Sequence, residues 1–326
     1  MQGKKIEISY RSIAFAILFP LALWFLWIIK ELLFALLIAL ILMSALKPIA
    51  YLLEKRGLNR TASVFIVFFL FILFFAALVS IIIPPIVSET VAFVKNFPKI
   101  VEGLPPDIQQ YIDVGTLSQY VPTATNNVVS VVGSIFSNFI FVLSTLFFTL
   151  YFMLEKNLIE KALTPIRDKK RKQHYITIVT QVERQMAAWF WGEIVLMTVI
   201  GTMTYIALSL IGIKYALPLA VLAGLLEVVP NLGPILASIP AVLVGASESL
   251  IIGLVVLALY FVIQQIENAV IVPLIMKRAV NVNPILTLIS LFVGGKIGGI
   301  LGVLLSIPLL IIIQTIASEI WKAKQQ

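Results

Sequence analysis

The sequence has no cysteine, a single histidine and few charged residues, which make up 12% of its 326 positions. Without cysteine, the chain can form neither a disulfide bond nor a cysteine-ligated metal site. The one histidine, His174, lies in a basic run and cannot by itself build a histidine metal cluster. We therefore expect neither a bound metal nor another cofactor. Because a soluble domain carries about 25% charged residues, the shortage of charge also argues against a soluble globular protein.

Hydrophobic residues make up 60% of the chain, against about 45–50% in a soluble domain. Several apolar runs reach the roughly 20 residues that a helix needs to cross a lipid bilayer. No small-residue cleavage site follows the first run, so we interpret it as a retained helix and not as a signal peptide. These patterns predict an all-α, polytopic helical membrane protein with about eight membrane segments, two of them interrupted or re-entrant.

The formal net charge of +8 comes from basic residues that cluster between the apolar runs. The densest cluster is RDKKRK, from Arg167 to Lys172. A nucleic acid could bind such a run, but a cytoplasmic face beside anionic lipid explains it better, so we expect no nucleic-acid partner. The distribution of basic residues predicts a multi-pass membrane protein with both termini in the cytoplasm.

Composition divides the chain into six segments. The third apolar run, Thr61 to Ile83, is expected to end or kink at Pro84-Pro85, because proline removes a helical hydrogen bond. The predicted segments are 1–87, three transmembrane helices; 88–130, an extracytoplasmic amphipathic cap; 131–154, a fourth transmembrane helix; 155–188, a basic cytoplasmic segment; 189–318, a transport core; and 319–326, a cytoplasmic tail.

The predicted core holds two interrupted helical elements. In the first, Tyr215 to Gly245, the chain should enter the membrane, break and return. In the second, Pro284 to Ile316, it should turn between Gly294 and Gly299. The motif Asn-x-x-Pro-Ile-Leu occurs in both elements, at 231–236 and 281–286, and interrupted repeats of this kind indicate a transporter binding site. Chance similarity between apolar segments is the alternative. The residues expected to form the breaks are Pro230, Gly233, Pro234, Pro284, Gly294, Gly295 and Gly298.

Two acids in this apolar sequence are the main candidates for binding an ion, a proton or a substrate. Glu227 precedes the first break; alternatively, it reaches a loop or pairs with Lys214. Glu267 shares a helical face with Gln264 and Asn268, by their spacing of three and four residues. Such a polar face could line a pathway, or it could form hydrogen bonds between helices.

Three further positions complete the candidates. Asn231, with the glycine and prolines that follow it, could present backbone oxygens to a cation, although a tight turn explains these residues equally well. Glu193 is expected at the membrane interface, near two tryptophans. Lys296 is expected either at a hairpin tip near water or as the partner of an acid.

Three stretches carry a family resemblance: LIALILMSALKPIAYLLEKRGLNRTAS (37–63), EVVPNLGPILASIPAVLVG (227–245) and the run QQIENAVIVPLIMKRAVNVNPILTLISLFVGGKIGGILGVLLSIPL (264–309). With the layout of the apolar runs, they resemble the autoinducer-2 exporter family of bacterial transporters. The resemblance implies a multi-pass protein of the bacterial plasma (inner) membrane with about eight helical membrane segments. It also implies a homo-oligomer, with a pentamer possible. It also implies export of a quorum-sensing signal, or exchange of Na⁺ or Li⁺ for protons. The sequence departs from the family at Lys296, where an acid is common, and at Glu193, where glutamine is common.

We therefore expect a secondary transporter and not an enzyme. It would move a small polar solute, such as a quorum-sensing signal, or exchange a monovalent cation for protons. The alternative is a passive channel or a structural membrane protein without transport activity. No GxxxxGK[ST] loop occurs, so the energy for transport would come from a gradient or from a partner protein.

Overall fold

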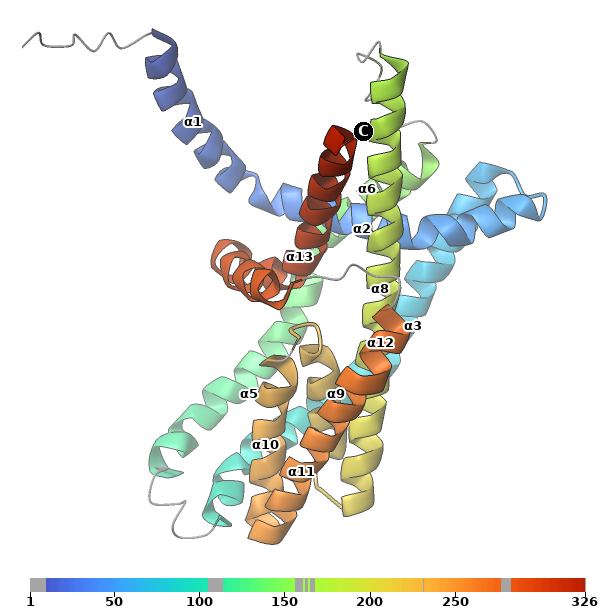
Figure 1. Cartoon of the computed structure of the whole chain (residues 1–326). Coiled ribbons are helices and arrows are strands. Elements are labelled where there is room, and N and C mark those ends of the chain that lie inside the picture. Colours follow the sequence, from blue (N-terminus) through green and yellow to red (C-terminus); the bar gives the residue numbers. More distant parts are fainter. Residues whose placement is uncertain are drawn as a thin grey trace, which may run out of the picture.

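The computed structural model describes residues 10–104, 114–155, 161, 164, 168–230, 232–276 and 283–325, and the ordered elements in these ranges are all helical (Figure 1). The predicted all-α class is confirmed. The elements are α1 (Tyr10–Ile28), α2 (Lys30–Lys55), α3 (Arg60–Glu102), α5 (Val114–Ser137), α6 (Phe139–Leu154), α8 (Lys169–Ile211), α9 (Ala216–Leu226), α10 (Leu232–Glu248), α11 (Leu250–Ile266), the π-helical η1 (Glu267–Ile271), α12 (Val272–Ile275) and α13 (Pro284–Gln325).

Five described segments are long and apolar enough to cross a bilayer. They are α2, α3, α8, the stretch Leu250–Ile275 and the stretch Ile285–Lys322. Shorter apolar helices accompany them, namely part of α1, α6, α9 and α10. The chain is therefore a polytopic membrane protein, as its hydropathy predicts.

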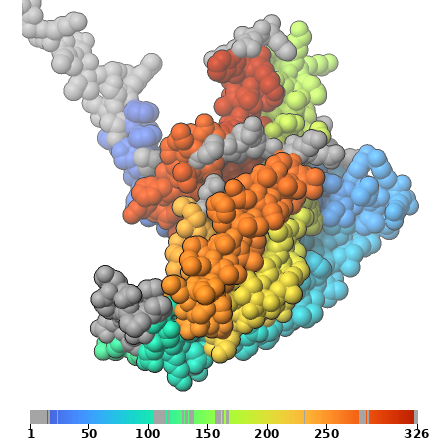
Figure 2. All heavy atoms as spheres, turned by 60° about the horizontal axis from the view of Figure 1, so that its bottom comes forward, coloured from blue at the N-terminus to red at the C-terminus, as the bar shows by residue number. Residues whose placement is uncertain are grey.

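Helix α8 is a long helix against which α2, α9, α11 and α13 pack (Figure 1). Its first half meets α2 and the last part of α13 in a buried cluster that contains Met186, Ile41 and Ile311. Its second half meets α9, and Leu208 packs there in a cluster that extends to Val256 of α11. In Figure 2, the orange surface of α11 lies beside the yellow end of α8.

The structure corrects two expected boundaries. Pro84 and Pro85 do not end the third helix, because α3 continues through them for 43 residues in all. Proline is tolerated inside membrane helices, where neighbouring groups can satisfy the freed carbonyls. The end of α3 lies within the predicted cap, yet its Ile100 packs against the core around α9 and α10. The expected fourth span, 131–154, is divided at Asn138 between α5 and α6.

Both predicted breaks in the core are present. The first separates α9 from α10. The second is the non-helical Gly299 within α13, with φ 58° and ψ −135°, a conformation that is essentially restricted to glycine. The two arms of α13 fold against each other. Ser306 Oγ lies 2.8 Å from the carbonyl oxygen of Ser290 on the first arm and 2.6 Å from that of Gly302 on its own arm, so its one proton can be donated to either. Gly294 lies so close to Gly302 that neither position has room for a Cβ atom.

The other residues predicted for the second break lie around this turn. Pro284 is the first residue of α13. Gly298 lies against the ring of Phe34, and a Cβ on Gly295 would come 3.3 Å from Val303. The turn itself is at Gly299, at the end of the range that the sequence indicates.

Candidate functional site

Three buried glutamates gather where α8, α9 and η1 meet. Glu193, Glu227 and Glu267 are only 7%, 4% and 4% exposed. The carboxyl groups of Glu227 and Glu267 lie within hydrogen-bonding reach of each other, and Glu193 is close enough to both to interact with them electrostatically. None of the ion pairs found among the described residues includes any of the three. The site is therefore a buried group of acids without a basic partner in the described part of the chain.

The turn after α9 places Glu227. The helix ends at Leu226, whose carbonyl accepts a hydrogen bond from the Val229 amide at 2.9 Å. The amide of Gly233 then donates to the Val229 carbonyl at 2.8 Å, which starts α10 directly beside the end of α9. A Cβ atom on Gly233 would overlap the carbonyl of Leu226. A glycine at this position therefore lets the two helix ends meet and holds Glu227 in the interior.

Close packing of α9 on α8 brings Glu227 toward Glu193. A Cβ on Gly224 would come 2.7 Å from the Met197 carbonyl and 3.3 Å from the Cα of Gly201. Such a glycine contact lets two helix backbones approach closely, as is common for helices packed in membranes. Gly224 is one turn before Glu227, so this contact also fixes the distance of the carboxyl from α8.

A π-helical turn places Glu267. This residue begins η1, and the amide of Val272, five residues later, donates to its carbonyl. Pro273 follows and has no amide hydrogen, so it cannot continue the regular helical pattern at that point. Short π-helical turns inside longer helices occur frequently at functional sites. The turn therefore places Glu267 within Leu250–Ile275, a helical stretch long enough to cross the membrane.

Several buried polar atoms at the acids and along α11 have no hydrogen-bond partner of ordinary geometry. They are one carboxyl oxygen each of Glu227 and Glu267, the amide nitrogen of Gln264 and, further along α11, the hydroxyl of Tyr260. Gln264 and Tyr260 precede Glu267 by about one and two helical turns. Unpaired buried polar groups cost about 1–3 kcal/mol each, so such a cluster suggests that a proton, an ion or water occupies the site.

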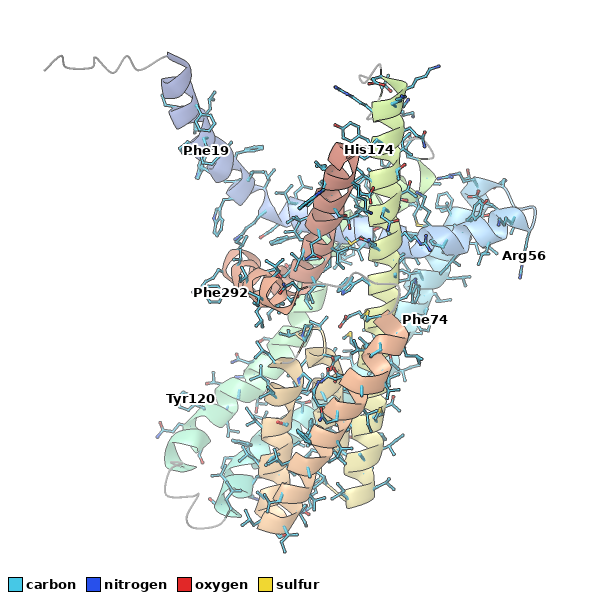
Figure 3. The ribbon with its side chains drawn as sticks, viewed as in Figure 1. Phe19, Arg56, Phe74, Tyr120, His174 and Phe292 are labelled. Carbon is cyan, nitrogen blue, oxygen red and sulfur yellow. The ribbon has the colours of Figure 1, made fainter. Side chains whose placement is uncertain are left out.

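No group of three His, Cys, Asp or Glu side chains in the described ranges is arranged to hold a metal ion. His174 lies near the start of α8 (Figure 3), roughly 28 Å along the helix from Glu193 at about 1.5 Å per residue. The acid pair can instead share a proton or contribute oxygen ligands to a hard monovalent cation.

The structure places the predicted site residues as follows. Glu227 and Glu267 are brought together, and Gln264 is half-buried next to Glu267. Asn268 is exposed, so the three polar residues of this stretch do not face the interior as one stripe. Asn231 lies outside the described residues. The carbonyls of Val229 and Pro230 accept hydrogen bonds from within the turn, as in the tight-turn interpretation.

Glu193, which the sequence places near the membrane interface, is not exposed to solvent or lipid in the described structure. The side chain is buried and belongs to the acid cluster. The spacing of Glu193 from Met186, Leu196 and Ile200, which are also buried on α8, is a sequence pattern that could have predicted its burial. Lys214 lines a separate pocket with Lys99 and is not the partner of Glu227. Lys296 is exposed near the α13 turn and makes no ion pair with the described residues, consistent with a hairpin-tip charge.

Comparison with known proteins relates the chain to membrane transport proteins. The family model described as "AI-2E family transporter" matches residues 13–322. The chain is 27% identical over 313 residues to "Putative transport protein YueF" of Bacillus subtilis (strain 168), which covers 89% of this chain and 84% of that protein. It is 22% identical to "Putative transport protein YrrI" of the same organism, over 86% of this chain and 84% of that protein. A shorter match, 30% identical over 37% of this chain and 34% of the relative, is to "Putative transport protein YhhT" of Escherichia coli (strain K12).

Proposed function

Since this chain belongs to the AI-2E family of transporters, we propose that it is a secondary transporter that exchanges a monovalent cation, Na⁺ or Li⁺, for protons at Glu227 and Glu267. One observation carries the proposal: two buried carboxyl groups lie within hydrogen-bonding reach of each other and have no basic partner in the described part of the chain. Export of a small polar solute, such as a quorum-sensing signal, is the other transport function of the family that the resemblance suggested.

The pair couples the two ions by competition. A hydrogen bond between two carboxyl oxygens requires a shared proton. Two ionised carboxylates about 4 Å apart repel by roughly 4 kcal/mol at an effective dielectric constant of 20. A cation that binds between the oxygens removes this repulsion, so it can replace the proton but does not bind together with it. This competition is the minimum requirement for antiport.

Other residues would attract the cation, contact it, or act as hinges during transport. Glu193 adds a third acidic group on the α8 side and would attract the incoming cation. Gln264, beside Glu267, supplies a side-chain amide that can contact the ion or its water. The breaks at Pro230 to Pro234 and at Gly299 are the hinges about which the helix pairs would move between inward- and outward-facing states.

Further features of the proposal come from the family resemblance and the charge pattern. We place the protein in the bacterial inner membrane with cytoplasmic termini, and as a homo-oligomer, with a pentamer as the expected assembly. It acts by transport and not by catalysis, without a cofactor. Its partners are the lipid bilayer, the cation and protons.

Proteoliposomes loaded with a pH-sensitive dye test the exchange. A pulse of external Na⁺ or Li⁺ should raise the internal pH, because protons leave as the cation enters. The variants Glu227→Gln and Glu267→Gln should each reduce this response by about 10-fold or more, since a charge-assisted interaction contributes roughly 1.5–3 kcal/mol. Glu31→Gln, an exposed acid on α2, is the matched control and should behave as wild type.

The outcomes separate the alternatives. A pH response that survives in both glutamine variants would remove the acid pair from the pathway. Cation flux without any proton movement would indicate a passive channel. Wild-type protein that is folded and inserted but moves neither ion would exclude antiport and leave solute export or a structural role.

A further inference from the structure

A second site candidate lies away from the acids, in a cleft of about 340 Å³ between α2, α3, α6 and α8. Its wall combines apolar groups, such as Pro48, Val64 and Ala187, with five charged side chains. None of the three glutamates of the proposed ion site lines it. The charged residues are Lys47, Glu54, Arg60, Glu183 and Arg184.

Two of the five charges neutralise each other. Lys47 Nζ lies 2.6 Å from Glu183 Oε2, and this ion pair ties α2 to α8 across the cleft. Glu54 and Arg184 make no ion pair with the described residues. Arg60 donates through Nη2 to the Met153 carbonyl at 2.9 Å, while its Nε is buried and has no partner. The cleft therefore offers one carboxylate and two guanidinium groups with hydrogen-bonding capacity to spare.

The cleft is expected at the level of the lipid headgroups. Its charged residues come from the two chain segments, around 47–60 and 155–188, that the positive-inside rule assigns to the cytoplasmic side. Trp191 lies on α8 about one turn beyond the cleft residue Ala187, and its indole Nε1 donates a hydrogen bond to the Ala45 carbonyl at 3.1 Å. Tryptophan is enriched at this boundary between hydrocarbon and headgroups. Arg56, at the turn between α2 and α3, extends outward from the molecule (Figure 3).

We propose that this cleft binds the headgroup of a zwitterionic aminophospholipid, with the phosphate on Arg60 and Arg184 and the ammonium group on Glu54. Guanidinium groups bind phosphate oxygens with paired, directional hydrogen bonds. A ligand with only a negative charge would leave Glu54 facing a like charge, whereas an aminophosphate satisfies both signs. The apolar wall suits the glycerol and upper acyl region of the same molecule.

Native mass spectrometry of the full-length protein in detergent can test this assignment. The delipidated protein is titrated with dioleoyl phosphatidylethanolamine, with dioleoyl phosphatidylglycerol and with soluble glycerophosphoethanolamine. We expect wild type to prefer phosphatidylethanolamine to phosphatidylglycerol by about three- to tenfold, the range for one or two partly exposed charge pairs. Glycerophosphoethanolamine should bind much more weakly, because it lacks the acyl chains.

Single substitutions test the proposed contact of Glu54 with the ammonium group and that of Arg184 with the phosphate separately. Glu54→Gln should abolish the preference for phosphatidylethanolamine while leaving phosphatidylglycerol binding intact or stronger. Arg184→Gln should weaken both lipids by about three- to tenfold, and Arg184→Lys should recover only part of that loss because it lacks the paired donors. Glu31→Gln on α2 and Lys170→Gln on α8, both exposed, are the matched controls and should match wild type.

Three results would overturn the proposal. The first is equal binding of the two lipids by wild type. The second is an unchanged lipid preference in Glu54→Gln when size-exclusion chromatography shows the variant to be monodisperse. The third is binding of the soluble headgroup as tight as that of the lipid, which would assign the cleft to a water-soluble phosphate compound.

Discussion

Replacing Gly233 by alanine should disturb the turn between α9 and α10 and, with it, the position of Glu227. The added Cβ atom would overlap the Leu226 carbonyl and lie 2.5 Å from the Leu226 carbonyl carbon. Both obstacles are backbone atoms, so no side-chain rotation can relieve them. The start of α10 must move away from the end of α9.

The size of the effect follows from two opposing terms. Overpacking a close contact costs typically about 1–3 kcal/mol, and a contact with rigid backbone belongs at the upper end of that range. Alanine in place of glycine within a helix returns up to about 1 kcal/mol. We therefore expect Gly233→Ala to lower the free energy of unfolding by about 1–2 kcal/mol. Because Glu227 is on the displaced turn, cation-driven proton movement should fall more than the stability loss alone would explain.

Equilibrium unfolding in mixed micelles measures the stability change, and the proteoliposome assay measures transport. Gly133→Ala on α5 is the matched control, because a Cβ there meets no atom within 4 Å; it should be neutral or slightly stabilising. Wild-type stability and transport in Gly233→Ala would refute the close approach of α9 and α10. A loss of stability with normal transport per folded molecule would instead separate this turn from the ion pathway.

Two further perturbations test the packing of other elements. Ser306→Ala should lower the free energy of unfolding by about 1 kcal/mol, because it removes a buried hydroxyl that donates to the carbonyl of Ser290 or of Gly302 where the arms of α13 meet. An unchanged midpoint in mixed-micelle unfolding would contradict a stabilising hydrogen bond from this hydroxyl. A double-mutant cycle on Lys47 and Glu183 should give a coupling free energy below about 1 kcal/mol that decreases in high salt, because the Lys47 side chain is 46% exposed. A salt-independent coupling free energy above about 2 kcal/mol would contradict this expectation.

Local chemistry explains what the sequence could predict about the site. Glu227 and Glu267 were identifiable because acids are rare in membrane-length apolar runs and must face protein or water. The first break was identifiable because Pro230 and Pro234 flank a glycine that a helix would not choose. The second turn was expected between Gly294 and Gly299, and only the backbone shows that Gly299 makes it.

Two side-chain positions could not be predicted, for equally specific reasons. The tryptophans near Glu193 indicate the membrane interface, and only the packing of α9 against α8 shows that Glu193 joins the acid cluster. A regular helical repeat puts Asn268 on the face of Glu267, but η1 departs from that repeat at Glu267 itself. In both cases the sequence shows that a polar residue is present but not which way its side chain points.

The sequence by itself determined the class of the protein, indicated the regions of its two helix breaks and singled out Glu227 and Glu267 as candidate site residues. These features depend on local composition: apolar runs must form helices in a bilayer, and proline, glycine and ionisable groups are conspicuous within them. Only the tertiary structure decided that three acids from α8, α9 and η1 share one site, and that Glu54, Arg60 and Arg184 share one cleft. Such groupings depend on how closely helices far apart in the sequence pack, and that distance is set by glycine contacts and by a π-helical turn whose effects are not local.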